Sequence, residues 1–144
     1  MSGAAVSVVD GFRAQATSVA VGVGASLDRG VEESANLVID GVSLLPGVID
    51  IERYAGRAVV VLCVIATLDE SALRDRFQIR ATGQRERQAH HYLDNFEAIL
   101  AIQRHLIEEA ERRGMLVIDN VDLDASVRML LAHVLDKLRR TATP

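Results

Sequence analysis

Apolar positions recur every three to four residues along the first part of the chain. This spacing places them on one side of a helix and predicts a helix over residues 4–29. A shorter helix is predicted in "DESALRDRFQIRA", where Thr67 or Asp69 can cap the first turn and Leu73 and Phe77 are the apolar contacts. The apolar side of the first helix consists of Val8, Phe12, Ala16, Val19, Val23 and Leu27.

Two further helical patterns occupy the second half of the chain. The first predicts a long helix from about residue 89 to 113, which Gly114 ends. The second predicts a last helix that begins after Asp122 or Asp124, because either side chain can cap its first turn. The expected buried faces are Tyr92, Phe96, Ile99, Leu106 and Ala110 in the long helix, and Val127, Leu130, Leu131, Val134 and Leu138 in the last helix.

Uninterrupted apolar runs predict strands that are buried on both faces of a sheet. Three such runs lie at residues 37–41, 58–66 and 115–119. Helical segments separate most of them, and this order predicts an α/β layer fold with a parallel sheet in one domain, residues 1–144. Because three strands make a thin parallel sheet, the sequence resembles part of a larger fold.

Composition narrows the class of protein. The 144 residues are 49% hydrophobic and 25% charged, as in a soluble globular domain. A net charge of −4 and an aromatic content of 3% argue against nucleic-acid binding. Cys63 is the only cysteine, so no internal disulfide forms, and the longest apolar stretch is shorter than the ~20 residues of a membrane helix. We therefore expect a cytoplasmic protein without a membrane partner.

One acid, Asp40, stands where the first predicted strand ends, and Gly41 follows it. In parallel sheets, ligands bind beyond the carboxyl ends of the strands, where an acid can hold Mg²⁺ or a substrate hydroxyl. A turn cap or a solvated loop acid is the simpler interpretation of this residue taken alone.

The stretch "RDRFQIRATGQRER" concentrates five arginines: Arg74, Arg76, Arg80, Arg85 and Arg87. Arg76 and Arg80 are one helical turn apart and share a face. Arginines that converge on a phosphoryl group stabilise its transition-state charge, and a hinged segment can close over it. The alternative is a solvated helix face whose arginines pair with nearby acids. The four histidines lack the spacing of a metal site.

A resemblance to the C-terminal part of the 2-phosphoglycerate kinase family rests on three stretches in order. They are "LVIDGVSLLPG", "VVVLCVIATLDESALRDRFQIRA" and "RERQAHHYLDNFEAILAIQRHLIEEAERRGMLVIDNVDLDASVRMLLAHVL". The Pro-Gly turn, the R-x-R-F-x-x-R segment and the Y-L-x-N-F-x-x-I helix carry it together. The resemblance implies a three-layer, P-loop kinase-like parallel sheet flanked by helices, here without its first strand and P-loop.

The resemblance also implies an activity, the transfer of a phosphoryl group from ATP, with Mg²⁺, to a small phosphorylated acid such as 2-phosphoglycerate. It implies catalytic roles for Asp40, Arg76 and Arg80. The substrate-binding residues that it implies are Ser43, Arg74, Arg85 and Arg87.

Three departures from the family pattern fall on candidate site positions. Asp40 stands in place of glutamate, Ser43 in place of histidine and Leu73 in place of histidine. No G-x-x-x-x-G-K-[ST] motif is present, so we expect the isolated chain to bind ATP and Mg²⁺ poorly. One interpretation is an acceptor-and-lid half, completed by a separate P-loop chain or by an upstream reading frame. The other is a non-catalytic kinase remnant that serves as a binding or oligomerising module.

The implied missing strand would lie between the strands at residues 37–41 and 58–66. Without it, these two strands either pair with each other or present open edges that favour self-association. We therefore expect the isolated chain to be an oligomer or poorly folded.

Overall fold

The computed structural model describes residues 2–83 and 95–142. These residues form four α-helices, a short 3-10 helix and a two-stranded parallel sheet. The elements are α1 (Ser2–Glu32), η1 (Glu52–Tyr54), β1 (Cys63–Ala66), α2 (Glu70–Gly83), α4 (Phe96–Arg112), β2 (Leu116–Asp119) and α5 (Leu123–Ala142). The predicted α/β class with a parallel sheet is confirmed.

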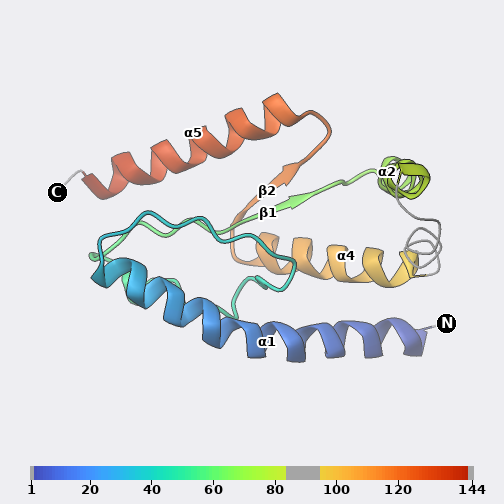
Figure 1. Ribbon diagram of the computed structural model, residues 1–144, viewed down its shortest axis with the longest axis horizontal. Helices are drawn as coiled ribbons and strands as arrows, with labels where there is room; N and C mark the ends of the chain where they lie inside the picture. The colour runs from blue at the N-terminus through green and yellow to red at the C-terminus, as the bar shows by residue number, and fades with distance from the viewer. Residues whose placement is uncertain (1, 84–94, 143–144) are drawn as a thin grey trace.

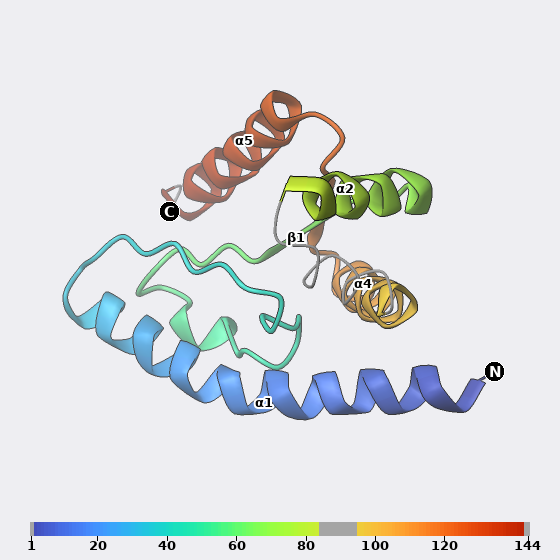
Figure 2. The ribbon, with the colours of Figure 1, turned by 45° about the vertical axis from the view of Figure 1, so that its right-hand side comes forward.

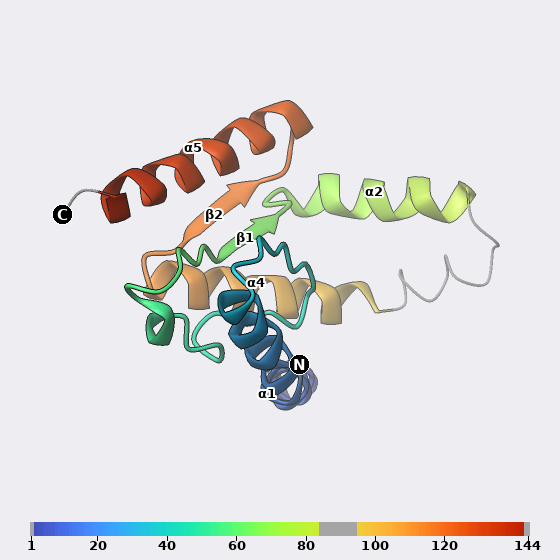
Figure 3. The ribbon, with the colours of Figure 1, turned by 60° about the vertical axis from the view of Figure 1, so that its left-hand side comes forward.

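The sheet lies between two helices. α5 packs on one side of it and α4 on the other, with α1 packed against α4 (Figures 1 and 3). In β1, Val64 and Ala66 are buried against Ala110 of α4. Ile65 points away from α4 and stays 54% exposed, so the second face of β1 is uncovered.

The helices form where the apolar patterns predict them, because their hydrogen bonds are local. The predicted first residues of the long helix, 89–94 with Tyr92, lie outside the described residues, and Val19 on the predicted apolar side of α1 is exposed. Phe12 and Ala16 of α1 are buried against α4, where the ring of Phe12 meets His105 edge-on with the centroids 6.4 Å apart. Gly114, with a φ of +62°, ends α4 as predicted. Within the residues that the structure describes, no helix is long and apolar enough to cross a membrane.

The predicted strand at residues 37–41 is wrong. Residues 35–40 adopt neither helix nor strand, and Val38 is 98% exposed. The predicted strand at 58–66 is strand only at Cys63–Ala66, and residues 58–62 are irregular. A strand requires a partner for its backbone groups, and in the described part of the chain no backbone hydrogen bond joins these two irregular segments. An apolar run alone is therefore not enough to form a strand at residues 37–41 or 58–62.

The predicted inner face of α5 is wrong in part. Leu130 and Val134 are partly buried, but Val127, Leu131 and Leu138 are exposed. The reason is the width of the sheet: β2 is the main packing partner of α5, and two strands are too few to cover its apolar side.

The Pro-Gly turn is a tightly packed structural feature. Val48 N–H donates to the Leu45 carbonyl at 3.2 Å, and Gly47 between them has a φ of +85°, which defines a type II turn with Pro46 at its second position. Leu45 and Pro46 are buried. The guanidinium group of Arg113, at the end of α4, lies directly over Gly47.

A clamp of Arg53, Tyr54 and Asp28 holds η1 to α1. The buried Tyr54 hydroxyl donates to Asp28 Oδ1 at 2.9 Å, and Arg53 Nη2 contacts both oxygens of the same carboxylate at 2.8 and 2.9 Å. Burial, and then the hydrogen bond to Asp28, raise the pKa of Tyr54. Ala58 N–H donates to the Tyr54 carbonyl at 3.0 Å, so the first residue of the segment 58–62 is also fixed to η1.

Glu109 is a buried carboxylate near the end of α4. Its side chain is 8% exposed and pairs with Arg112 at 2.7 Å and with Arg113. Burial acts to raise the pKa of Glu109, but the hydrogen bond from Arg113 and both arginine charges outweigh it, so its pKa is lowered.

We expect this carboxylate to stabilise the folded state at neutral pH and to lose that contribution as the pH falls below about 4. A lowered folded-state pKa has this sign, because protonation is then harder in the folded than in the unfolded chain. Urea unfolding of the wild type and Glu109→Gln at pH 7 and pH 3 measures it. The two stabilities should differ at pH 7 and converge at pH 3; a constant difference would contradict the assignment.

Candidate functional site

The carboxyl ends of β1 and β2 lie side by side. Ala66 is opposite Asp119 in the parallel register, and Asn120 N–H donates to the Ala66 carbonyl at 2.7 Å. Asp119 Oδ1 accepts the backbone N–H of Leu68 at 3.1 Å. Ligands of parallel α/β sheets bind beyond this edge, so the residues here are the first candidates for a site.

Arg76 joins α2 to both strand ends. Its guanidinium group donates to Thr67 Oγ1 at 3.0 Å and to the backbone carbonyl of Asn120. Gln103 of α4 supports buried Thr67 from the other side, since Gln103 Nε2 donates to the Thr67 carbonyl at 3.0 Å. The contacts of Arg76 are therefore internal to the fold.

The other predicted arginines lie along α2 or beyond it. Arg74 lies over the ring of Phe96 at 4.2 Å and within 3.8 Å of the Glu97 carboxylate. Arg80 is in α2, but its side chain is outside the description. The predictions for Arg85 and Arg87 fall outside the described residues.

Asp40 and Ser43 lie in the connection between α1 and η1. Asp40 is exposed, and Ser43 is partly buried within a turn that Leu44 N–H closes on the Gly41 carbonyl at 3.2 Å. Among the interactions of the described residues, none joins Asp40 to Arg74 or Arg76. The structure thus brings Arg76 to the sheet edge but does not bring Asp40 into contact with it.

A carboxylate caps each of the two helices that follow the strands, α2 and α5. Asp69 caps α2 by accepting from Ser71 N–H at 2.8 Å and Ala72 N–H at 3.2 Å. The Ser71 hydroxyl, followed by these two N–H groups, lowers the pKa of Asp69. Asp122 caps α5 by accepting from Ala125 N–H at 2.7 Å. Phosphates bind at helix N-termini, and the negative charges of Asp69 and Asp122 there oppose the phosphates of ATP.

Metal binding finds no support in the described ranges. No group of three or more histidine, cysteine, aspartate or glutamate side chains in them could hold an ion.

The sequence did not predict three residues at the sheet edge. They are Asp119, Asn120 and Thr67, the last as a partner of Arg76. Asp119 follows the apolar run "LVI", as Asp40 does, and the same rule about strand ends would have selected it. The role of Gln103 has no local signal, because α4 brings it to Thr67 from 36 residues away.

Comparisons with known proteins give one consistent result. A 2-phosphoglycerate kinase of Pyrococcus furiosus is 30% identical over 130 residues, which are 90% of this chain and 41% of that enzyme. The corresponding kinase of Thermococcus kodakarensis is 33% identical over 131 residues, 91% of this chain and 43% of that enzyme. This chain is similar to the 2-phosphoglycerate kinases over nine-tenths of its length. The resemblance seen in the sequence is therefore confirmed.

The similarity to the 2-phosphoglycerate kinases has a clear limit. The chain spans about two-fifths of the length of the curated relatives that it matches, consistent with their C-terminal part. No protein-family model matches the chain. No solved structure matches it either.

Proposed function

We propose that this chain is the acceptor-and-lid part of a kinase that transfers a phosphoryl group from ATP to a small phosphorylated acid of the 2-phosphoglycerate type. The observation that carries the proposal is the similarity to proteins named 2-phosphoglycerate kinase over 90% of the chain. The parallel sheet between helices is compatible with it. A three-layer P-loop kinase arrangement of the complete sheet belongs to the same proposal.

The residue roles extend this proposal. Asp40 would accept the proton of the acceptor hydroxyl or hold Mg²⁺ through water, and Arg80 would stabilise charge on the transferred phosphoryl group. Arg76 would position α2, because its observed contacts fix this helix to Thr67 and Asn120. The anionic groups of the acceptor would be bound by Ser43, Arg74, Arg85 and Arg87.

The phosphates of ATP would be held by polypeptide outside these 144 residues. The carboxylate caps of Asp69 and Asp122 support this, because they occupy the helix N-termini at the sheet edge. The relatives have room for such a segment, since the matched residues are only 41% of the Pyrococcus furiosus enzyme. ATP supplies the phosphoryl group and the chain supplies the acceptor site.

A chimera tests the proposal. The part of the Pyrococcus furiosus kinase that this chain does not match is joined to this chain, and ADP formation is measured with and without 2-phosphoglycerate. We expect ADP formation that depends on 2-phosphoglycerate in the chimera and in neither part alone. Isothermal titration of the isolated chain should show weak or no binding of ATP with Mg²⁺.

Two results would contradict the proposal. Micromolar binding of ATP by the isolated chain would require a phosphate site within these 144 residues. A folded chimera that binds ATP but forms no ADP in response to 2-phosphoglycerate would favour the non-catalytic binding module instead.

A further inference from the structure

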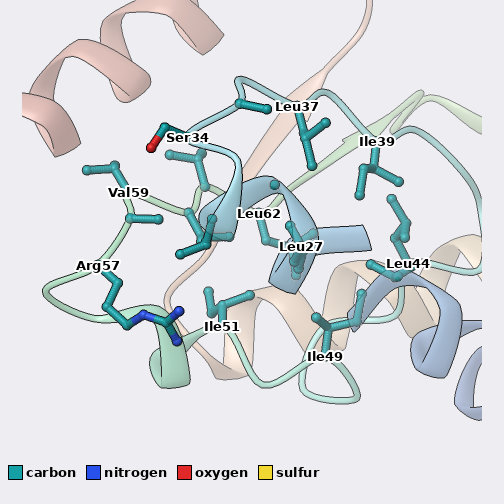
Figure 4. Close-up of a pocket in the computed structure, with 17 residues that line it drawn as sticks. Leu27, Ser34, Leu37, Ile39, Leu44, Ile49, Ile51, Arg57, Val59 and Leu62 are labelled. Atoms are coloured by element: carbon teal, nitrogen blue, oxygen red, sulfur yellow. The ribbon is translucent and has the colours of Figure 1, made fainter. Parts of the chain in front are cut away.

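The apolar run at residues 58–66 ends in polar surroundings. Where it begins, it lines with α1 an apolar cavity of about 310 Å³, in which only Ser34 and Arg57 have polar side chains (Figure 4). Thr67 follows the run directly, is only 6% exposed, and forms hydrogen bonds with side chains of α4 and α2. The polar contacts therefore gather at the carboxyl end of β1 and not at the cavity.

A side-chain amide of α4 pairs with the backbone of Thr67. Gln103 Nε2 donates to the Thr67 carbonyl at 3.0 Å, and Gln103 Oε1 accepts from the Thr67 N–H at 3.3 Å. Two residues that face each other on antiparallel strands exchange the same two kinds of bond. Gln103 therefore takes the place of a strand partner for the residue that follows β1.

This pairing requires the amide group of Gln103. A primary amide is a donor and an acceptor at once, whereas a carboxylate only accepts and an ammonium group only donates. A carboxylate at this place would bring negative charge to the Thr67 carbonyl and remove its donor, which is costly for a buried group. Both backbone groups of Thr67 are thus paired through the chemistry of one side chain.

Arg76 binds the hydroxyl group of the same threonine. Arg76 Nη1 donates to Thr67 Oγ1 at 3.0 Å, and Arg76 Nη2 donates to the Asn120 carbonyl that follows β2. A β-branched side chain has few rotamers, so a fixed Thr67 backbone also fixes the place of Oγ1. The contacts therefore run from Gln103 of α4 through the end of β1 to α2.

The helix α2 extends beyond the sheet to which it is attached. Figures 2 and 3 show α2 leaving the carboxyl end of β1 and running away from the two strands. Toward α4, the ring of Phe77 meets Phe96 edge-on, with the centroids 6.2 Å apart. Arg76 joins the helix to the ends of both strands, so the direction of α2 relative to the sheet depends on this residue.

We propose that Gln103 is a positioning residue for α2. By pairing with the backbone of Thr67, it holds the hydroxyl group to which Arg76 donates, and it thereby fixes the direction of the helix. The consequence for catalysis rests on the proposed function: α2 carries Arg80, so the place of this charge-stabilising arginine depends on Gln103. Gln103 acts on it through two other residues.

Hydrogen exchange in the 144-residue chain tests the positioning without measuring activity. We expect Gln103→Glu to raise the exchange rates of the amides of residues 74–79 by at least about tenfold, because α2 opens more often once its link to the strands is loosened. The amides of α4 should stay protected and serve as the reference for folding. Glu108→Gln, the reverse change at an exposed position of α4, is the matched control and should alter neither helix.

A milder variant covers the case in which Gln103→Glu also loses the protection of α4. Gln103→Asn keeps the amide but shortens the side chain by one methylene group, so the amide no longer reaches Thr67. It should raise the exchange rates of α2 while α4 stays protected. Wild-type exchange of α2 in a Gln103 variant whose α4 is protected would overturn the proposal.

Variants of Thr67 distinguish positioning from a general loss of packing. Thr67→Val removes the hydroxyl group and should raise the exchange rates of α2, whereas Thr67→Ser keeps the hydroxyl group and should preserve slow exchange. Because Gln103 acts through this hydroxyl group, the double variant of Gln103→Glu with Thr67→Val should exchange no faster than Thr67→Val alone. Additive effects would contradict the proposal, since Gln103 would then reach α2 by another route.

Kinetics of the chimera described above test the consequence for catalysis. We expect Gln103→Glu and Thr67→Val to lower kcat by about tenfold or more, the scale of a displaced catalytic group, and to leave KM for ATP unchanged. An unchanged kcat in an active chimera whose α2 exchanges faster would overturn the role of Gln103 in catalysis. A wild-type chimera without activity would contradict the proposed function alone, because the exchange results do not depend on it.

Discussion

Replacing Gly47 with alanine will destabilise the folded chain by about 2–4 kcal/mol. Two physical effects combine. The φ of +85° at this position is a left-handed conformation that side chains rarely adopt. A Cβ atom would also overlap the guanidinium group of Arg113. Arg113 cannot move away freely, because it pairs with the buried carboxylate of Glu109.

Gly22→Ala is the matched control for Gly47→Ala. Gly22 lies within α1, has no atom within 4 Å of an added Cβ, and should gain up to about 1 kcal/mol from the helix propensity of alanine. Urea unfolding of both variants at neutral pH measures the two effects. Equal stabilities for Gly47→Ala and the wild type would show that the turn and Arg113 rearrange at no cost.

Replacing Arg76 with alanine will cost about 2–3 kcal/mol of folding stability. The guanidinium group is the link between α2 and the ends of both strands, and its loss removes the donor to Thr67 Oγ1 and to the Asn120 carbonyl. Arg104→Ala is the control, since Arg104 makes an exposed ion pair with Glu70 that is worth at most about 1 kcal/mol. If Arg76 lay on a solvated helix face, the alternative that the sequence left open, the substitution would change folding stability by only about ±0.5 kcal/mol.

Kinetics of the chimera separate positioning from catalysis at Arg76. We expect Arg80→Ala to lower kcat by about 10²-fold, the scale of losing one donor to transition-state charge. Arg76→Lys keeps the charge but not the forked geometry, so it should lose stability along with Arg76→Ala. Unchanged stability with a large loss of kcat in both Arg76 variants would instead mean that Arg76 contacts the phosphoryl group directly.

The helices were predictable from the sequence, because their hydrogen bonds and caps involve residues within a few positions. The period of apolar residues predicted α1. Asp69 and Asp122 marked the starts of α2 and α5, and Gly114 marked the end of α4. The similarity to 2-phosphoglycerate kinases could also be recognised from the sequence, because it rests on short motifs that follow one another in the family's order.

Strands and side-chain partners depended on residues far away in the chain. The apolar run at residues 37–41 has strand composition but no neighbour to pair with, so it stays irregular, whereas Cys63–Ala66 becomes a strand because β2 lies beside it. Arg76 has the sequence context of a phosphate-binding arginine, yet the fold directs it to a carbonyl 44 residues away. Pairing and burial are properties of the assembled chain, and no local pattern contains them.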